Sequence, residues 1–306
     1  MYASVGDGSG VSRWCRALVL LGLTSALLAC GGGGGGGGSD EADDSADSGT
    51  DSGSHADDLL PVTDGSWYRP ELAVSWQWQL TGTLNTAYAV SLYDLDLFDT
   101  PVATITALQQ AGHKVVCYFS AGSYENWRED ATDFAPAVLG NNLDGWAGER
   151  WLDIRADSVL ALMATRLDLA AEKGCDAVEP DNMDGYLNNP GFALTAADQI
   201  SYNRAIANAA HERGLGVALK NDLDQIGALV DYFDFAVNEQ CFEYDECDRL
   251  MPFIDQGKPV LNAEYNSRYV NSRAERDSLC EQALELQFST LILPLDLDDS
   301  FRFSCP

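Results

Sequence analysis

The chain has 306 residues, of which 46% are hydrophobic and 22% are charged, and its formal net charge is −30 at pH 7. This length fits one large domain or two small ones. The acidity argues against a nucleic-acid partner, because phosphate binding needs clustered Lys and Arg, whereas a cationic or neutral ligand is compatible with it.

Residues 1–30 are typical of an export signal. Arg13 and Arg16 precede an apolar run at 17–29, which is too short to span a bilayer core of roughly 30 Å as a helix. The run ends in "LLAC", residues 27–30, which resembles the lipobox of bacterial lipoproteins. We therefore expect an exported protein with a lipidated Cys30, anchored at the outer membrane or cell surface. An ordinary signal peptide is the alternative.

Residues 31–58 predict a disordered tether. Eight glycines at 31–38 are followed by a segment with eight Asp and Glu residues, no Lys or Arg, and no aromatic residue. Such a composition buries too little apolar surface to offset the entropy of ordering. Residues 59–306 then carry a formal charge of −23, because 1–30 contribute +1 and 31–58 contribute −8. This part is expected to be a single catalytic domain.

Short apolar runs alternate with helical patterns along residues 59–306. Near-continuous apolar runs are typical of parallel strands covered on both faces, and they predict strands at 73–78, 88–94, 114–120, 175–180, 216–221, 233–239, 259–265 and 290–295. Helices are expected at 101–112, 157–173, 195–213, 223–230, 246–257 and 272–287. Eight strands with helical crossovers predict an α/β fold of the (β/α)8 TIM-barrel type. A doubly wound open sheet is the rival, although no GxGxxG follows the first strand.

The six cysteines beyond residue 30 indicate disulfides, because an even count is typical of exported domains. Two pairs are close in sequence, and the remaining two cysteines lie on consecutive predicted strands, which suggests Cys241–Cys247, Cys280–Cys305 and Cys117–Cys175. Six cysteines allow fifteen pairings, so this choice depends on the strand assignment. A zinc cluster is the competing interpretation, but the chain has no CxxC pair and only three His residues.

Polar side chains follow nearly every predicted strand at its carboxyl end, where barrel enzymes carry their active sites. The non-aromatic members are Asp94, Asp96, Ser120, Glu179, Asp181, Asn182, Lys220, Asn221, Glu239, Glu264 and Asp296. Aromatic residues near the same ends are candidates for stacking on sugar rings, with core packing as the alternative: Trp76, Tyr93, Tyr118, Tyr124, Trp127 and Tyr265.

The residue types restrict the chemistry. His55, His113 and His211 all lie away from the strand ends, and no GxSxG is present, which disfavours metal hydrolases and Ser-His-Asp triads. A pair of carboxylates remains, and glycoside hydrolysis is the commonest reaction that uses one. Asp181 and Glu239, on the fourth and sixth strands, are expected to face each other across the barrel. No metal or other cofactor is expected.

Six motifs together resemble glycoside hydrolase family 114, the endo-α-1,4-polygalactosaminidase family. They are "VCYFSAGSYENWR", "GCDAVEPDNMDGY", "LTAADQISYNR", "GLGVALKNDLDQ", "FDFAVNEQCFEYDEC" and "LPLDLDDSFRFSC". The resemblance covers residues 65–306. It implies a (β/α)8 barrel that cleaves α-1,4-linked galactosamine polymers, with Asp181 of "EPDN" and Glu239 of "VNEQC" as the catalytic pair.

The expected partner is thus a cationic galactosamine-containing polysaccharide, and we expect a monomer that uses a retaining mechanism. The other polar and aromatic residues named above are predicted to bind substrate. Three alternatives remain open from the sequence: a hydrolase of another α-linked glycan, a sugar-binding lipoprotein without activity, and a metal-dependent deacetylase. The last needs a His and Asp ligand set that the chain does not supply.

Overall fold

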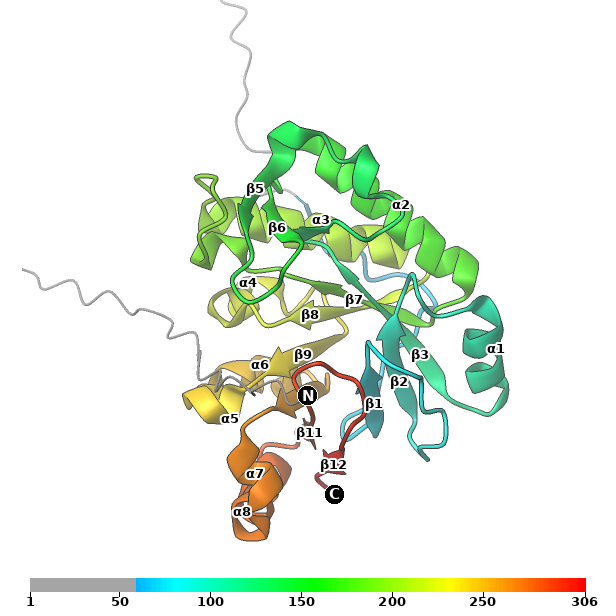
Figure 1. The fold of residues 1–306 in the computed structure, drawn as a ribbon, viewed down its shortest axis with the longest axis vertical. Helices are drawn as coiled ribbons and strands as arrows, with labels where there is room; N and C mark the ends of the chain where they lie inside the picture. The colour runs from blue at the N-terminus through cyan, green and yellow to red at the C-terminus, as the bar shows by residue number, and fades with distance from the viewer. Residues whose placement is uncertain (1–58) are drawn as a thin grey trace, which may run out of the picture. The chain divides into compact units, whose positions relative to one another are not determined.

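The computed structural model describes residues 59–306, so the predicted signal, the tether and Cys30 lie outside the described part. Eight parallel strands form the centre of the fold (Figure 1). They are β1 (Trp76–Gln79), β2 (Leu92–Asp96), β3 (Lys114–Ser120), β7 (Ala177–Asp181), β8 (Gly216–Lys220), β9 (Phe235–Glu239), β10 (Val260–Glu264) and β11 (Ser289–Ile292). All eight predicted strands are confirmed, with ends that differ by a few residues.

The strands follow one another in chain order around a curled sheet, and each pair from β1 to β11 is parallel. The short strand β12 (Phe303–Ser304) pairs antiparallel with β11. Side-chain contacts to the backbone connect β1 with β11 and with the segment between β11 and β12. The Trp76 indole donates to the carbonyl of Ser289 (2.9 Å), and the Arg302 guanidinium donates to the carbonyl of Trp76 (2.7 Å).

Alternation along the strands separates two apolar cores. Inward side chains of all eight strands form the core of the barrel, which includes Trp76, Trp78, Leu92, Val116, Ala177, Ala218, Phe235, Leu261 and Leu291. The outward side chains, such as Tyr93, Cys117 and Val217, pack in a larger core with the surrounding helices. The fold is therefore a TIM-type (β/α)8 barrel, as predicted, rather than a doubly wound open sheet.

Helices cover the outside of the curled sheet (Figure 1). Their bounds are α1 (Val102–Gln110), α2 (Asp157–Lys173), α3 (Ala196–Glu212), α4 (Ile226–Leu229), α5 (Cys241–Tyr244), α6 (Met251–Asp255), α7 (Ser267–Asn271) and α8 (Arg273–Glu285). Thr195 caps α3 through a reciprocal capping box with Asp198, and Gly174 ends α2 with a left-handed backbone. The loop 80–91 joins β1 to β2 without a helix. Within residues 59–306, no helix combines the length and apolar character needed to cross a membrane.

An insertion between β3 and α2 forms a second, antiparallel sheet that the sequence did not predict. It consists of β4 (Ser123–Glu125), β5 (Leu139–Asn142) and β6 (Glu149–Leu152), in the order β4-β6-β5. These strands have three or four residues each, which is too short for a clear alternating pattern. The insertion starts at the carboxyl end of β3, so it covers one side of the barrel mouth.

The three suggested disulfides are confirmed. Cys117–Cys175 links the outer faces of β3 and the loop before β7, Cys241–Cys247 closes a short loop after β9, and Cys280–Cys305 ties the C-terminus to α8. All six cysteines beyond residue 30 are therefore paired, which excludes the zinc cluster considered from the sequence.

Candidate active site

Two carboxylates and one ammonium meet at the barrel mouth, the end where the eight strands have their carboxyl ends. The Lys220 ammonium, at the end of β8, lies 3.0 Å from Asp181 Oδ1 on β7 and 3.3 Å from Glu239 Oε2 on β9. Because both oxygens contact the same nitrogen, they can lie at most 6.3 Å apart, the total of the two distances. Strands that flank β8 on either side thus deliver two acids to one point.

Accessibility separates the three groups. The side chains of Asp181 and Glu239 are 20% and 28% exposed, whereas that of Lys220 is 3% exposed. The two acids are therefore open to a ligand, while the cation lies below them. Burial alone disfavours a charged amine, but the nearby carboxylates outweigh it and raise the pKa of Lys220 well above its usual range. Lys220 remains charged and balances part of the negative charge at the mouth.

Each acid also accepts hydrogen bonds from neutral donors. Asp181 Oδ2 accepts from the Tyr118 hydroxyl at 3.0 Å, and Asp181 Oδ1 accepts from the Asn182 backbone N–H at 2.7 Å. Glu239 Oε1 accepts from the Tyr265 hydroxyl, and Glu239 Oε2 lies 3.4 Å from the Asn221 amide. Such donors fix the orientation of the two carboxyl groups.

The backbone is unusual where these strands end. Asn182 after β7, Asn221 and Asp222 after β8, and Gln240 after β9 all have positive φ values between 47° and 64°. Residues other than Gly seldom adopt this left-handed conformation, and it is concentrated at functional sites. Asn and Asp tolerate it best, which accounts for three of the four residues.

A second pair of acids lies deeper in the barrel, below Lys220. Asp94 and Glu179 are fully buried. Within residues 59–306, none of their carboxylate oxygens accepts a hydrogen bond. The nearest cation is the Lys220 ammonium, which lies 3.4 Å from Glu179 Oε1. Burial raises the pKa of Asp94 to about 7, and burial together with Asp94 raises the pKa of Glu179 well above its usual range. The two carboxyls thus favour a protonated form, in which one can donate to the other.

Four residues that were predicted to bind substrate lie away from Asp181 and Glu239, which corrects the sequence-based expectation. Trp76 is at the amino-terminal end of β1, and Tyr93 and Glu264 project from the outer side of the barrel, because alternation places their neighbours Asp94 and Ala263 inside. The Tyr93 hydroxyl donates to the Tyr88 carbonyl, and Glu264 accepts from Phe242 N–H. Asp296 is exposed in the loop after β11.

Other predicted residues support the mouth indirectly. Ser120, at the end of β3, accepts from the Asn182 amide, whereas Tyr124 contacts Phe134 inside the insertion and Trp127 is 52% exposed. Asp96 forms a bidentate ion pair with Arg128 of the insertion, at 2.6 and 3.0 Å. Asp96 is therefore an anchor for the insertion.

Three buried polar residues of the insertion were not predicted from the sequence: Ser123, Arg128 and Glu149. Arg128 binds Asp96 and Glu125 together, and Ser123 donates to Glu149 at 2.8 Å. Arg166 of α2 completes the frame by binding Asp130 and the Ser120 carbonyl. The motif "VCYFSAGSYENWR" contains Ser123 and Arg128, but without the antiparallel sheet nothing in it indicates their partners.

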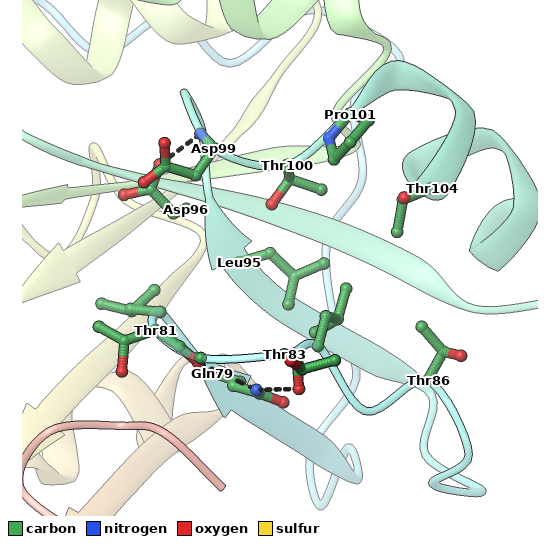
Figure 2. A pocket seen from close by; sticks show the side chains of 13 residues that line it. Gln79, Thr81, Thr83, Thr86, Leu95, Asp96, Asp99, Thr100, Pro101 and Thr104 are labelled. Atoms are coloured by element: carbon green, nitrogen blue, oxygen red, sulfur yellow. Dashed lines mark hydrogen bonds between the residues drawn. The ribbon is translucent and has the colours of Figure 1, made fainter.

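A pocket of about 330 Å³ lies beside the loop 80–86 and the start of α1 (Figure 2). Five threonines line it, together with Asp96 and the exposed Asp99. Gln79 in its wall is already satisfied, because its amide donates to the carbonyls of Thr81 and Thr83. Asp181 and Glu239 do not line this pocket. Within residues 59–306 as a whole, no cluster of three or more His, Cys, Asp or Glu side chains has the arrangement of a metal site.

Comparisons with known proteins agree with this geometry. The profile of glycoside-hydrolase family GH114 matches residues 58–306. A solved structure of Aspergillus fumigatus Ega3 in complex with galactosamine shares 43% of its residues, covers 79% of this chain and 99% of its own, and superimposes with a TM-score of 0.75. A search among curated proteins returned no match.

A more distant structure shares the fold. The glycoside hydrolase domain of PelA from Pseudomonas aeruginosa is 15% identical, with a TM-score of 0.58 over 74% of this chain and 96% of its own. At that identity the likeness concerns the fold alone. The family profile spans all the described residues, and the carboxylate pair lies where barrel glycosidases carry out their chemistry. The chain is therefore a glycoside hydrolase and belongs to family GH114.

Proposed function

We propose that this protein is an endo-acting hydrolase of α-1,4-linked galactosamine polymers that uses Asp181 and Glu239. The convergence of the two acids on Lys220 carries the proposal, since the upper limit of 6.3 Å between their nearest oxygens suits direct attack on the sugar. Retaining glycosidases hold their carboxyl groups roughly 5–5.5 Å apart, whereas inverting enzymes need roughly 6.5–9.5 Å to admit a water molecule.

In this proposal Asp181 is the nucleophile and Glu239 is the general acid and base. Asp181 has the shorter contact with Lys220, and the Tyr118 hydroxyl and the Asn182 backbone N–H hold its two oxygens in place for attack. Glu239 protonates the departing glycosidic oxygen while Asp181 bonds to the anomeric carbon. The Glu239 carboxylate then takes a proton from water, and the resulting hydroxide releases the sugar from Asp181 with retained configuration.

The substrate class is supported by similarity and by charge. Ega3, at 43% identity, was solved with galactosamine bound. Residues 59–306 carry a formal charge of −23, which attracts a polymer of protonated amino sugars and raises its concentration near the mouth. A neutral polymer gains nothing from this field.

The test is hydrolysis by the purified protein of partly deacetylated α-1,4-galactosamine polymer, followed by reducing-end analysis. Chitosan serves as a cationic polymer with a different linkage, and amylose as a neutral α-1,4-linked polymer. We expect cleavage of the galactosamine polymer alone, with α-configured products seen first by NMR. Asp181→Asn and Glu239→Gln should each lose roughly 10²- to 10⁴-fold in kcat with unchanged circular dichroism. Faster cleavage of amylose would reject the substrate, and initial β-anomers would reject retention.

We also propose that the protein is exported and anchored through a lipid on Cys30. The support is the sequence "LLAC" after a short apolar run, followed by a glycine-rich and acidic segment. Metabolic labelling with a fatty-acid analogue in a bacterial host should label the wild-type protein but not Cys30→Ser. Cys15→Ser is the matched control and should retain the label; equal labelling of all three proteins would refute the anchor.

A further inference from the structure

A chain of hydrogen bonds leads from the insertion to the proposed nucleophile. Glu149 on β6 accepts from the Ser123 hydroxyl at 2.8 Å, and the Ser123 and Ser120 hydroxyls are 2.6 Å apart. Ser120 accepts from the Asn182 side-chain amide at 2.9 Å, and the Asn182 backbone N–H donates to Asp181 at 2.7 Å. Each step lies within ordinary hydrogen-bond distance.

The chain of contacts is shielded from water. Ser120 and Ser123 have no exposed surface, and Glu149 is 8% exposed. Glu125 lies directly opposite Glu149 across β4 and β6, but Arg128 neutralises Glu125 with contacts of 2.8 and 2.9 Å. Glu149 has no ion pair within the described residues, so the Ser123 hydroxyl is its hydrogen-bond partner there.

Tight packing links the turn after β3 to the residues after β7. The Asp181 carbonyl accepts from the backbone N–H groups of Ala121 and Gly122 at 2.9 and 3.0 Å. A Cβ atom on Gly122 would lie 1.7 Å from the Asn182 carbonyl oxygen, so glycine is required there. Asn182 itself has φ of 60°. A change in the serine hydrogen bonds is therefore transmitted to Asn182, because the tight packing leaves no free space for the two segments to move independently.

We propose that Glu149 is a positioning residue for Asp181, which acts through Ser123, Ser120 and Asn182. The inference rests on the proposed function, because it takes Asp181 as the reacting group. Ionised Glu149 accepts from Ser123, Ser123 then accepts from Ser120, and Ser120 accepts from the Asn182 amide. All four groups are satisfied in this one direction.

Protonation of Glu149 makes the reverse order possible. Its carboxyl can then donate to Ser123, and Ser123 donates to Ser120, which already accepts from Asn182. The Ser120 hydroxyl proton is left without an acceptor in the chain, because an amide nitrogen cannot accept. Protonated Glu149 therefore weakens the hold on Asn182, and through it the orientation of Asp181.

The change of charge state falls in a useful pH range. Burial is the main cause that raises the pKa of Glu149 to about 7; Glu125 and Asp181 add to the rise, while Ser123 and Arg128 oppose it. The titratable or charged groups that interact with it are Glu125, Arg128, Asp181 and Tyr118. Activity should therefore decline on the acidic side of neutrality as Glu149 gains its proton.

The decisive comparison is Glu149→Gln against Glu149→Ala in the full chain. The Gln side chain is the uncharged counterpart of protonated Glu149 and does not titrate, so kcat should stay near the wild-type value at acidic pH and should not rise to the wild-type plateau above pH 7. Glu149→Ala removes the acceptor, and kcat should fall about tenfold with KM unchanged. Glu285→Gln, on the exposed end of α8, is the matched control and should keep both kcat and the wild-type pH profile.

A measurement that does not need activity separates this inference from the proposed function. The side-chain amide signal of Asn182 in ¹⁵N NMR should shift with a midpoint near pH 7 in the wild-type protein and stay constant in Glu149→Gln. An Asn182 signal that ignores pH in the wild type overturns the inference, as does Glu149→Ala with wild-type kcat. Failure of the wild type to cleave the polymer rejects the proposed function but leaves the NMR test in force.

Discussion

The Lys220 ammonium lies 3.0 Å from Asp181 Oδ1, almost completely buried beneath it. The same ammonium is 4.9 Å from the centre of the Trp78 ring, whose face also stabilises a cation. Three carboxyl groups contact this one charge, because Glu179 and Glu239 are within 3.4 Å of it as well. The charge of Lys220 therefore affects both the electrostatics of the active site and the stability of the barrel.

Replacement of Lys220 by Met should damage both activity and stability. The loss of the cation leaves Asp181 and Glu239, whose side chains are only 20% and 28% exposed, without their counter-charge, and breaking a buried ion pair in this way typically costs about 3–5 kcal/mol. The loss should be larger at pH 8 than at pH 5, because the acids can take up protons at the lower pH. Thermal unfolding and kcat at both pH values measure this.

The control for that experiment is Lys114→Met. Lys114 also pairs with an acid, Asp176, at 2.7 Å, but its side chain is 47% exposed. An exposed pair contributes at most about 1 kcal/mol, so this variant should stay near wild type. Equal effects of the two substitutions would show that Lys220 has no special role at the mouth.

The two tyrosines at the mouth should report on different catalytic roles within the first chemical step. Tyr265→Phe removes the hydrogen bond to Glu239, and Tyr118→Phe removes the bond to Asp181. Bonds to charged groups contribute about 1.5–3 kcal/mol, so each variant should lose roughly 10- to 100-fold in kcat on the polymer. An aryl galactosaminide with a good leaving group needs no acid for its first step. On this substrate, the burst-phase rate of Tyr265→Phe should therefore return to the wild-type value.

Tyr118→Phe should stay impaired on the aryl substrate, because attack by Asp181 is still required. Tyr93→Phe is the control, since its hydroxyl donates to the Tyr88 carbonyl on the outer side of the barrel and it should keep wild-type kcat. Recovery of Tyr118→Phe in place of Tyr265→Phe would exchange the roles of the two acids.

Much of this site follows from the chain order of strands and acids. Asp181, Lys220 and Glu239 each end a strand, and neighbouring parallel strands have to bring such residues together. The prediction was wrong for Tyr93 and Glu264, because proximity to a strand end does not specify the face: a shift of one residue turns a side chain from the inside to the outside. Strand ends predicted from sequence are uncertain by more than one residue, so they do not show which face a side chain near a strand end occupies.

The insertion was beyond prediction for a different reason. Glu149 and Ser123 are 26 residues apart and meet only because β4 and β6 pair in an antiparallel sheet. Strands of three or four residues leave no periodic signal, and a buried Glu looks like any surface acid in a sequence this rich in Asp and Glu. The motif resemblance identified the segment that contains Ser123, but it gave no information about the contacts of that segment.

Loss of the Cys117–Cys175 disulfide should cost more stability than loss of Cys241–Cys247. The first closes a loop of 58 residues and the second a loop of 6. Loop-closure entropy in the unfolded chain then gives roughly 4 kcal/mol against roughly 2 kcal/mol. The double Cys→Ala variants remove similar buried side chains, so denaturant unfolding under non-reducing conditions compares them directly. A larger loss for Cys241→Ala with Cys247→Ala would contradict the entropic ranking.

The stability of the domain should fall as the pH rises from 5 to 8. Burial raises the pKa of several acids far above their ordinary values, to about 7 for Asp94, Glu149 and Glu264 and from 3.8 to about 8 for Asp222. Such groups bind more protons in the folded state than in the unfolded state, so stability is lost as the pH rises between the unfolded and folded pKa values.

Asp222→Asn isolates this effect at one position. Asp222 is 1% exposed, its Oδ2 accepts from Asn203, and its Oδ1 has no partner among the described residues. An Asn side chain keeps an acceptor for Asn203, suits the φ of 47°, and carries no charge to bury. The variant should therefore be more stable than wild type at pH 8, by on the order of 2 kcal/mol or roughly 4–8 °C in Tm, with a smaller gain at pH 5. Asp168→Asn, whose parent side chain is 59% exposed, should show no such dependence on pH. A gain that is the same at both pH values would mean that Asp222 stays ionised in the folded protein, and the burial argument for its carboxyl would fail.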